Sequence, residues 1–353
     1  MTQSIISVDG MGGDFGPKVT IPALAEAHIK HPQVRFLLFG DEAKLHKYLA
    51  EYPALQDGVE VRHCEITVAM DEKLSVALRQ KRKESSMWCA IEAVKNGQAQ
   101  ACLSAGNTGA LMAMSKIILR THIGIERPAI AAIWPTLRGR SVMLDAGANI
   151  GGTAAQYVQF AVMGATYARI ILNLPNPRIG LLNIGVENIK GTEDLREAAD
   201  LLARSSLNFV GFIEGNGIGR GDADVIVTDG FTGNVALKTA EGTAVQISNY
   251  LREAMSSSLI SRLGYLFASR ALATLKQRMD PNSANGGMFL GLNGSVVKSH
   301  GGANRASFEA AIEVAIEVAQ ANMADTIADD MMTMQQLLDS TVTTTSIEAL
   351  GME

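Results

Sequence analysis

Ile5-Ile6-Ser7-Val8-Asp9 is a short apolar run that leads directly into the glycine-rich turn Gly10-Met11-Gly12-Gly13-Asp14. A helical pattern follows at residues 18–30, and a second apolar run comes at residues 34–40. The same order recurs along most of the chain, because each apolar run ends in Gly, Asn or Asp before a helical stretch. This rhythm predicts β-α-β units and a three-layer α/β fold, in which helices cover both faces of a mostly parallel sheet.

The other apolar runs extend this pattern over the whole chain. Asp41 is placed to cap a helix that ends near residue 51, and Ala- and Met-rich helices are expected at 303–322 and 326–350. No repeat or linker divides the sequence, so residues 1–353 are predicted to form a single catalytic unit in which any two lobes are interleaved. Further strands are expected at residues 59–63, 101–104, 129–133, 141–145, 179–183, 209–213 and 225–228.

The composition is typical of a globular enzyme. The 353 residues are 47% hydrophobic and 19% charged, and the net charge of −5 gives no sign of nucleic-acid binding. Cys64, Cys89 and Cys102 are widely spaced, which argues against a disulfide framework or a zinc site. The first residues lack a basic segment, and no run of about 18 apolar residues occurs, so we expect a cytoplasmic protein without a signal peptide or membrane span.

Glycine-rich turns follow six of the predicted strands, and each turn carries Asn, Thr or Asp. In open parallel sheets, ligands bind at the carboxyl ends of strands, where helix N-termini offer free N–H groups. One such turn is usually only a connection, but six turns with this many polar side chains favour an anion or phosphoester pocket at the rim of the sheet. They lie at residues 9–14, 104–109, 145–149, 183–191, 214–217 and 228–234.

No standard catalytic motif accompanies these turns. Arg220 replaces the third glycine of a dinucleotide loop, and residues 233–239 lack the second glycine of a phosphate loop. Without a recognisable protein nucleophile, direct attack of phosphate on a carbonyl is attractive, because the protein then needs only to position phosphate and stabilise an oxyanion. Lys190 could pair with phosphate or be a solvated loop lysine, and Asn234 could donate to the oxyanion. His300 follows an apolar strand and is equally compatible with a site or a loop position.

Seven motifs together resemble the phosphate acyltransferase family, the acyl-carrier-protein:phosphate acyltransferases of bacterial phospholipid synthesis. The resemblance covers residues 5–325, with the motifs in family order. One departure follows the Gly-Ala-Asn turn, where Ile150-Gly151-Gly152-Thr153 stands in place of the usual acidic residue. The motifs are 9–14, 104–110, Arg127-Pro128-Ala129-Ile130, 144–149, 183–191, 228–234 and Lys298-Ser299-His300-Gly301.

The resemblance implies transfer of an acyl group from acyl carrier protein to inorganic phosphate, with acyl phosphate passed to a membrane glycerol-3-phosphate acyltransferase. It also implies a fold like that of isocitrate and isopropylmalate dehydrogenases, a homodimer, and neither a cofactor nor a metal. Lys190 and Asn234 correspond to the catalytic positions, Lys190 for phosphate and Asn234 for the thioester oxyanion. The residues expected to hold phosphate or the pantetheine end are Gly12, Gly13, Asp14, Asn107, Thr108, Asn149, Asp229, Gly233 and His300.

A helical arm is expected at residues 245–282, within a long helical segment that begins near Phe231. Its apolar residues recur at helical spacing among basic ones, which suits either a membrane surface or a dimer interface. The resemblance favours peripheral membrane contact, for which the expected residues are Leu259, Leu263, Leu266 and Phe267. The interspersed basic residues are Arg252, Arg262, Arg270, Lys276 and Arg278.

Other functions also fit parts of the sequence. A phosphotransacetylase-like exchange between coenzyme A and phosphate needs the same chemistry, whereas a decarboxylating NAD-dependent dehydrogenase of this fold needs clustered Asp and Arg residues that form no visible motif. A non-catalytic membrane scaffold would use only the arm. Acidic carrier proteins dock on basic patches, and the run Arg79, Lys81, Arg82 and Lys83 is either such a patch or a solvated helix face.

Overall fold

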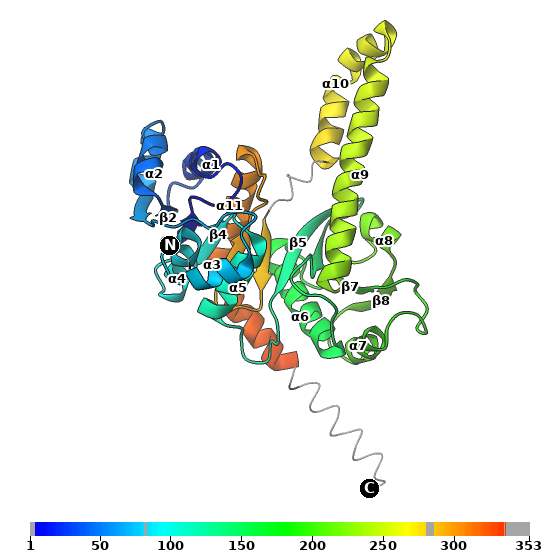
Figure 1. Ribbon diagram of the computed structural model, residues 1–353. Helices are drawn as coiled ribbons and strands as arrows, with labels where there is room; N and C mark the ends of the chain where they lie inside the picture. Colours follow the sequence, from blue (N-terminus) through cyan, green and yellow to red (C-terminus); the bar gives the residue numbers. More distant parts are fainter. Residues whose placement is uncertain (1–3, 81–82, 280–285, 335, 337–353) are drawn as a thin grey trace.

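The short apolar runs form one sheet in the computed structural model, which describes residues 4–80, 83–279, 286–334 and 336 (Figure 1). Over these residues the strand order is β3-β2-β1-β4-β11-β10-β5-β6-β9-β7-β8. The strands are β1 Ile5–Asp9, β2 Arg35–Gly40, β3 Val59–His63, β4 Ala101–Ser104, β5 Ala129–Thr136, β6 Gly139–Leu144, β7 Ile179–Leu182, β8 Phe209–Ile213, β9 Val225–Val227, β10 Gly287–Leu290 and β11 Ser295–Lys298.

Helices cover both faces of this sheet, so the predicted three-layer α/β architecture is confirmed. Buried side chains of α1, α2, α6, α7 and α11 pack on one face, and those of α3, α4, α5 and α8 pack on the other with the start of α9. The helices are α1 Pro17–Lys30, α2 Glu42–Leu49, η1 Pro53–Gly58, α3 Leu74–Gln80, α4 Ser86–Lys95, α5 Thr108–Leu119, α6 Ala154–Ile171, α7 Glu193–Ala203, α8 Gly215–Arg220, α9 Gly230–Ser256, α10 Leu259–Met279 and α11 Arg305–Gln320.

Local signals place several of these boundaries. The Asp41 carboxylate accepts a hydrogen bond from the Lys44 backbone N–H at 3.1 Å, which confirms Asp41 as the N-cap of α2. Residues 323–334 are helical after α11, while residues 337–350 of the expected last helix lie outside the described part of the chain. Strand β10 was not predicted, because its four residues offer no alternating pattern of useful length.

The two halves of the sheet run in opposite directions. Strand β10 is antiparallel to both of its neighbours, and β5 is antiparallel to β6. The sheet is therefore mostly parallel within each half, as predicted, but the glycine-rich turns do not share one edge of it. The turns after β1, β4 and β11 point one way, and those after β6, β7 and β9 point the other way.

One row of paired residues explains how these turns still meet. Apart from the residues on β10 and β5, each member of the row is the last or second-to-last residue of its strand. The two halves of the sheet therefore extend from this row in opposite directions. The carboxyl ends of six strands therefore meet along one line across the middle of the sheet. The row consists of Val8, Leu103, Val297, Met288, Ala131, Leu144, Val227 and Leu181.

The predicted helical arm is present as a hairpin. Helices α9 and α10 pack side by side and project away from the sheet in Figure 1, with a break between them at Ser257 and Ser258. Residues 280–282 of the expected arm, the side chains of Lys276 and Arg278, and residues 81–82 of the basic run lie outside what the structure describes. In the described part of the chain, no helix combines the length and the apolar character needed to cross a bilayer.

Candidate active site

Asp9, the last residue of β1, organises the first group of turns. It is 2% exposed and accepts hydrogen bonds from Ser86 Oγ at 2.6 Å and Ser104 Oγ at 2.7 Å. Burial raises the pKa of Asp9, and these two hydroxyl groups act in the opposite direction. Ser86, which lies 77 residues from Asp9 at the start of α4, was not among the predicted site residues.

The predicted residues Gly12, Gly13 and Asp14 lie where this turn meets two others. A Cβ at Gly12 would lie 2.7 Å from the Gly106 nitrogen, and Gly13 has a φ of +86°. The Asp14 N–H donates to the Gly301 carbonyl at 2.9 Å. Glycine is therefore needed here for close backbone approach and for a left-handed conformation, and the turns after β1, β4 and β11 form one group.

Asn107 and Thr108 begin α5 at the edge of this group. The Asn107 Oδ1 atom accepts from the Ala110 N–H at 3.0 Å, so Asn107 caps the helix, and its Nδ2 donates to the Met70 carbonyl at 2.7 Å. Thr108 is the first residue of the helix and is exposed. Asn107 therefore stabilises the start of α5, and Thr108 beside it is exposed to solvent.

Asp145 plays the same organising role in the second group of turns. It is fully buried and accepts backbone hydrogen bonds from Ile130, Gly147, Ala148 and Asn149. Burial raises the pKa of Asp145, and these bonds act in the opposite direction. The predicted Asn149 is buried as well, and its amide group donates to Asp145 and to the Pro128 carbonyl, so its N–H groups support the turn.

Helix α6 follows this turn without the family's usual acidic residue. The Thr153 hydroxyl accepts from the Gln156 N–H at 3.3 Å, and the Gln156 side chain accepts from the Thr153 N–H at 3.2 Å. This reciprocal pair is a capping box. Thr153 therefore supplies the cap that the departure from the family pattern put in doubt.

The first turn of α9 carries three predicted residues. Asp229 caps the helix by accepting from the Phe231 and Thr232 N–H groups at 2.9 and 3.1 Å. A Cβ at Gly233 would lie 2.0 Å from the Asp145 carbonyl oxygen, so only glycine allows this approach. Asn234 is exposed, and the Cβ position of Gly147 is 3.6 Å from the Asn234 Cβ. Its side chain thus lies against the turn that Asp145 holds.

Lys190 is exposed on the loop after β7, the strand next to β9 in the sheet. Its N–H donates to the Glu187 carbonyl at 3.0 Å, and Asn183 Nδ2 donates to its carbonyl at 3.2 Å. Within the described residues, no hydrogen bond or ion pair joins the Lys190 side chain to Asn234 or to either group of turns. The structure thus places Lys190 on a neighbouring loop and does not bring it into contact with the other predicted residues.

Helix α9 links the two groups of turns. Lys238 follows Asn234 by four residues, hence on the same face of the helix, and it acts electrostatically on Lys298 and His300 of the first group. His300 is exposed, and the Gly302 N–H donates to its Nδ1 at 3.2 Å. Partial burial of the imidazole ring lowers the pKa of His300, and Lys238 adds to this effect.

Lys298 belongs to the motif at residues 298–301 but was not among the predicted site residues. It ends β11, pairs with Ser104 of β4, and donates through Nζ to the Ala105 and Ser299 carbonyls. Burial lowers the pKa of Lys298 to about 8. Because side chains alternate along a strand, Lys298 lies on the face opposite Val297. Lys238 follows Asn234 at helical spacing. Both positions could therefore be found from the sequence.

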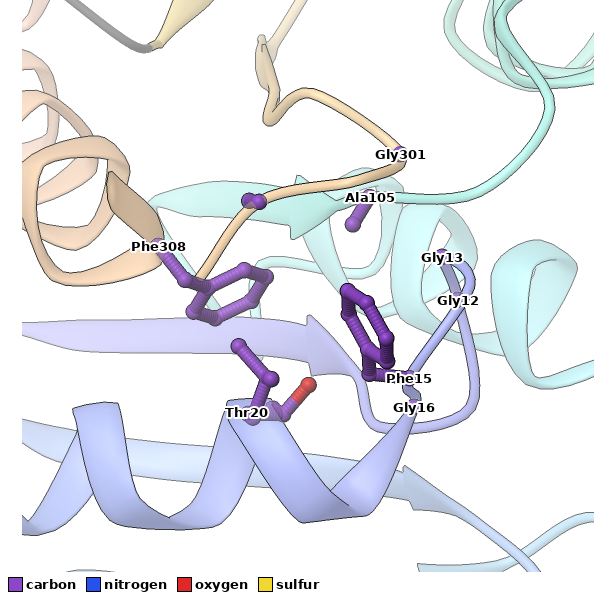
Figure 2. A pocket seen from close by; sticks show the side chains of 10 residues that line it. Gly12, Gly13, Phe15, Gly16, Thr20, Ala105, Gly301 and Phe308 are labelled. Carbon is purple, nitrogen blue, oxygen red and sulfur yellow. The ribbon is translucent and has the colours of Figure 1, made fainter. Parts of the chain in front are cut away.

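A small apolar pocket lies beside the first group of turns. Figure 2 shows the rings of Phe15 and Phe308 in it, close to Thr20. Its cavity volume is about 10 Å³, which is roughly the space that one water molecule needs. The pocket is therefore far too small to enclose a substrate. Among the described residues, no three His, Cys, Asp or Glu side chains are grouped so that they could hold a metal ion.

Comparison with known proteins identifies the family. A family model described as "Fatty acid synthesis protein" matches residues 5–326. The chain is 53% identical over 329 residues to a phosphate acyltransferase of Brucella canis, covering 92% of this chain and 95% of the relative. The chain belongs to the phosphate acyltransferase family. A phosphate acyltransferase of Mesorhizobium japonicum is 54% identical, with 92% of each chain covered, and the predicted enzyme class is confirmed.

Solved structures confirm the fold of this phosphate acyltransferase family member. A phosphotransacetylase from Streptococcus pyogenes superimposes with a TM-score of 0.58 at 17% identity, over 90% of this chain and 94% of the other. A 4-hydroxythreonine-4-phosphate dehydrogenase from Burkholderia phymatum gives a TM-score of 0.50 at 15% identity, over 90% and 99%. The expected dehydrogenase-like α/β fold is therefore correct.

Proposed function

We propose that the protein transfers a fatty acyl group from acyl carrier protein to inorganic phosphate. A phosphate oxygen attacks the thioester carbonyl carbon, and the C–O bond forms as the carbonyl oxygen becomes an oxyanion. The oxyanion then collapses, the C–S bond breaks, and the carrier thiolate takes up a proton. The products are acyl phosphate and free carrier protein.

The position of Asn234 is the observation that carries this proposal. Its amide is exposed on the first turn of α9, over the turn that Asp145 holds and one helical turn before Lys238. An amide donor that points at a developing oxyanion stabilises it. Lys190, on the next loop, is proposed to neutralise phosphate charge, and Gly12, Gly13, Thr108 and His300 to line the path of phosphate or pantetheine.

We also propose that the arm contacts the membrane surface, where an acyl phosphate would be passed to a glycerol-3-phosphate acyltransferase. The exposed fractions of Ile260 and Phe267 are 83% and 91%, and Leu259, Leu263 and Leu266 are also exposed. Arg262 and Arg270 lie among them on α10. Apolar side chains mixed with arginines suit an anionic bilayer surface, although a second copy of the chain could cover the same helix in a homodimer.

Incubation with palmitoyl carrier protein and orthophosphate tests the reaction. We expect an acyl phosphate that reacts with hydroxylamine, and a rate that depends on phosphate concentration. Palmitoyl-coenzyme A in the same assay tests the phosphotransacetylase-like alternative, which the shared fold permits. Full turnover in phosphate-free buffer, or a fatty acyl group covalently attached to the enzyme, would refute the direct attack by phosphate.

A further inference from the structure

Two of the three cysteines lie next to each other beside the first group of turns. Cys64 directly follows β3 and is 5% exposed. Cys89 lies at the end of the first turn of α4 and is half-buried. Both thiol groups are free. The two cysteines are well separated in the sequence and form no motif there, so only the fold brings them together.

The backbone explains why the two cysteines meet. Ile66, two residues after Cys64, forms a parallel β-bridge with Ser85. The same register, continued back by two residues, places Cys64 beside Lys83 at roughly the 4.8 Å spacing of paired strands. The Cys89 Sγ atom donates to the Lys83 carbonyl at 3.6 Å. Cys64 and Cys89 therefore both lie against Lys83.

The two thiol groups also interact directly. A hydrogen bond joins them, and both side chains pack in the same apolar cluster. This bond lowers the pKa of Cys89, against the effects of burial and of the nearby carboxylates of Glu92 and Glu84. The same bond and burial raise the pKa of Cys64. Cys89 is therefore the thiol that ionises first, and Cys64 is the protonated donor beside it.

We propose that Cys64 and Cys89 are a redox-sensitive pair, which a peroxide converts into a reversible disulfide bond. The Cys89 thiolate attacks one oxygen of hydrogen peroxide, the O–O bond breaks, and a sulfenic acid forms. The departing hydroxide takes up the proton that Cys89 released. The Cys64 sulfur then attacks the sulfenic sulfur, and its proton leaves with the hydroxyl group as water. Both sulfur atoms are oxidised, the peroxide is reduced to water, and a dithiol reverses the reaction by exchange.

The segment between the two cysteines supports the first group of turns. The Met70 carbonyl accepts from Asn107 Nδ2 at 2.7 Å, and the Ser86 hydroxyl donates to Asp9 at 2.6 Å. A bond between the cysteines closes this segment into a ring and restrains it at both ends. The inference goes beyond the proposed function and does not depend on it.

Peptide mapping after treatment with hydrogen peroxide tests the pair. Tryptic peptides 63–73 and 84–95 contain one cysteine of the pair each, and peptide 96–116 contains Cys102. We expect peroxide to link 63–73 to 84–95 within one chain. The denatured protein should then have one free thiol in place of three, and dithiothreitol should restore all three. Three remaining thiols, or a link through Cys102, would overturn the proposal.

Serine variants separate the roles of the two cysteines. In Cys64→Ser the sulfenic acid of Cys89 has no partner, so dimedone should label peptide 84–95 and no link should form. In Cys89→Ser the buried Cys64 stays protonated, so neither a label nor a link is expected. Cys102→Ser is the matched control, because Cys102 is 0% exposed and its loss should leave the link intact. Equal labelling of Cys64→Ser and Cys89→Ser would overturn the role of Cys89 as the attacking thiol.

Thermal unfolding tests whether the folded protein accommodates the bond. A disulfide between neighbouring thiols restricts mainly the unfolded chain, so oxidation should raise the Tm by about 5 °C. The increase should disappear with dithiothreitol and should be absent from Cys64→Ser. A Tm that falls on oxidation would show that the two thiols do not meet in the native fold. None of these measurements uses acyl transfer, so their outcome is independent of the proposed function.

Discussion

At the scale of single residues, Asn234 is the side chain on which the proposed chemistry depends most. We expect Asn234→Ala to lower kcat by about 100- to 1,000-fold, the usual cost of removing one oxyanion donor. Asn234 is exposed, so the free energy of unfolding should change little. Hydroxylamine-trapped acyl phosphate measures the rate. Asn249→Ala, at an exposed position on the same helix, is the control, and equal rates in the two variants would contradict the role of Asn234.

Two buried carboxylates give these residues their positions. Asp9 gathers hydroxyl groups from α4 and β4, and Asp145 gathers backbone N–H groups from the turn that begins with it. Each carboxylate ends or directly follows a strand of one half of the sheet. The two groups of turns are therefore built on the same principle, in which a buried acceptor compensates for its burial by ordering the backbone around it.

At the scale of elements, the close contact between α9 and the turn at Asp145 depends on Gly233. Gly233→Ala would place a methyl group 2.0 Å from the Asp145 carbonyl oxygen. We expect it to lower the free energy of unfolding by about 1–3 kcal/mol and to lower kcat, because Asn234 moves with the helix. Chemical denaturation and the acyl phosphate assay measure the two effects.

Gly242→Ala on the same helix is the matched control for Gly233→Ala. Apart from the backbone of its own helix, no atom of the described residues lies within 4 Å of the position a Cβ would take at Gly242. Alanine should therefore stabilise α9 by up to about 1 kcal/mol through its higher helix propensity, with activity retained. If Gly242→Ala is also destabilised, α9 tolerates no substitution at either glycine. The comparison with Gly233→Ala would then contradict a specific role of the turn at Asp145.

The arm is the second element with a testable role. Leu263 is 57% exposed on α10, and Leu263→Asp adds a negative charge to the surface proposed to meet the membrane. We expect this variant to lose binding to anionic vesicles in a flotation assay while phosphate-dependent turnover in solution persists. Ile123→Asp, at a position 97% exposed away from the arm, should bind like the wild type. Vesicle binding retained by Leu263→Asp would exclude the membrane role.

At the scale of the whole molecule, one ion pair fastens strands of the second half of the sheet. The Arg178 Nη2 atom donates to Asp224 Oδ1 at 2.8 Å, and the Arg178 backbone N–H donates to Asp224 Oδ2 at 2.8 Å, just before β7 and β9 begin. Burial opposes ionisation of Asp224, but the bonds from Arg178 outweigh it and lower its pKa. The pair therefore stabilises the folded state whenever Asp224 is charged.

The pH dependence of stability tests this pair. Because the folded pKa of Asp224 is lowered, its contribution is fully present above the unfolded value of 3.8 and is lost as pH falls through the folded pKa. Asp224→Asn should lower the free energy of unfolding at pH 7 by about 2 kcal/mol, and its difference from the wild type should shrink below pH 3.8. A difference independent of pH would show that the charge is irrelevant.

The sequence by itself determined most strands of both halves, the helical arm and the family, but not β10. Each depends on signals within a few residues, such as the apolar run and glycine turn at 5–14 or the motif at 228–234. Asn234 could be selected in the same way, and so could the capping role of Asp41. These features are local, because hydrogen-bonding residues and turn glycines act on the backbone within one turn.

Only the tertiary structure decided how the turns come together. The opposite directions of the two halves depend on β10 and on pairings between strands far apart in the chain, and no local pattern encodes that register. The same packing gives Asn149 and Gly233 structural roles and brings Ser86 to Asp9. Burial and the meeting of distant strand ends are properties of the assembled core, so they appear only when all the strands are in place.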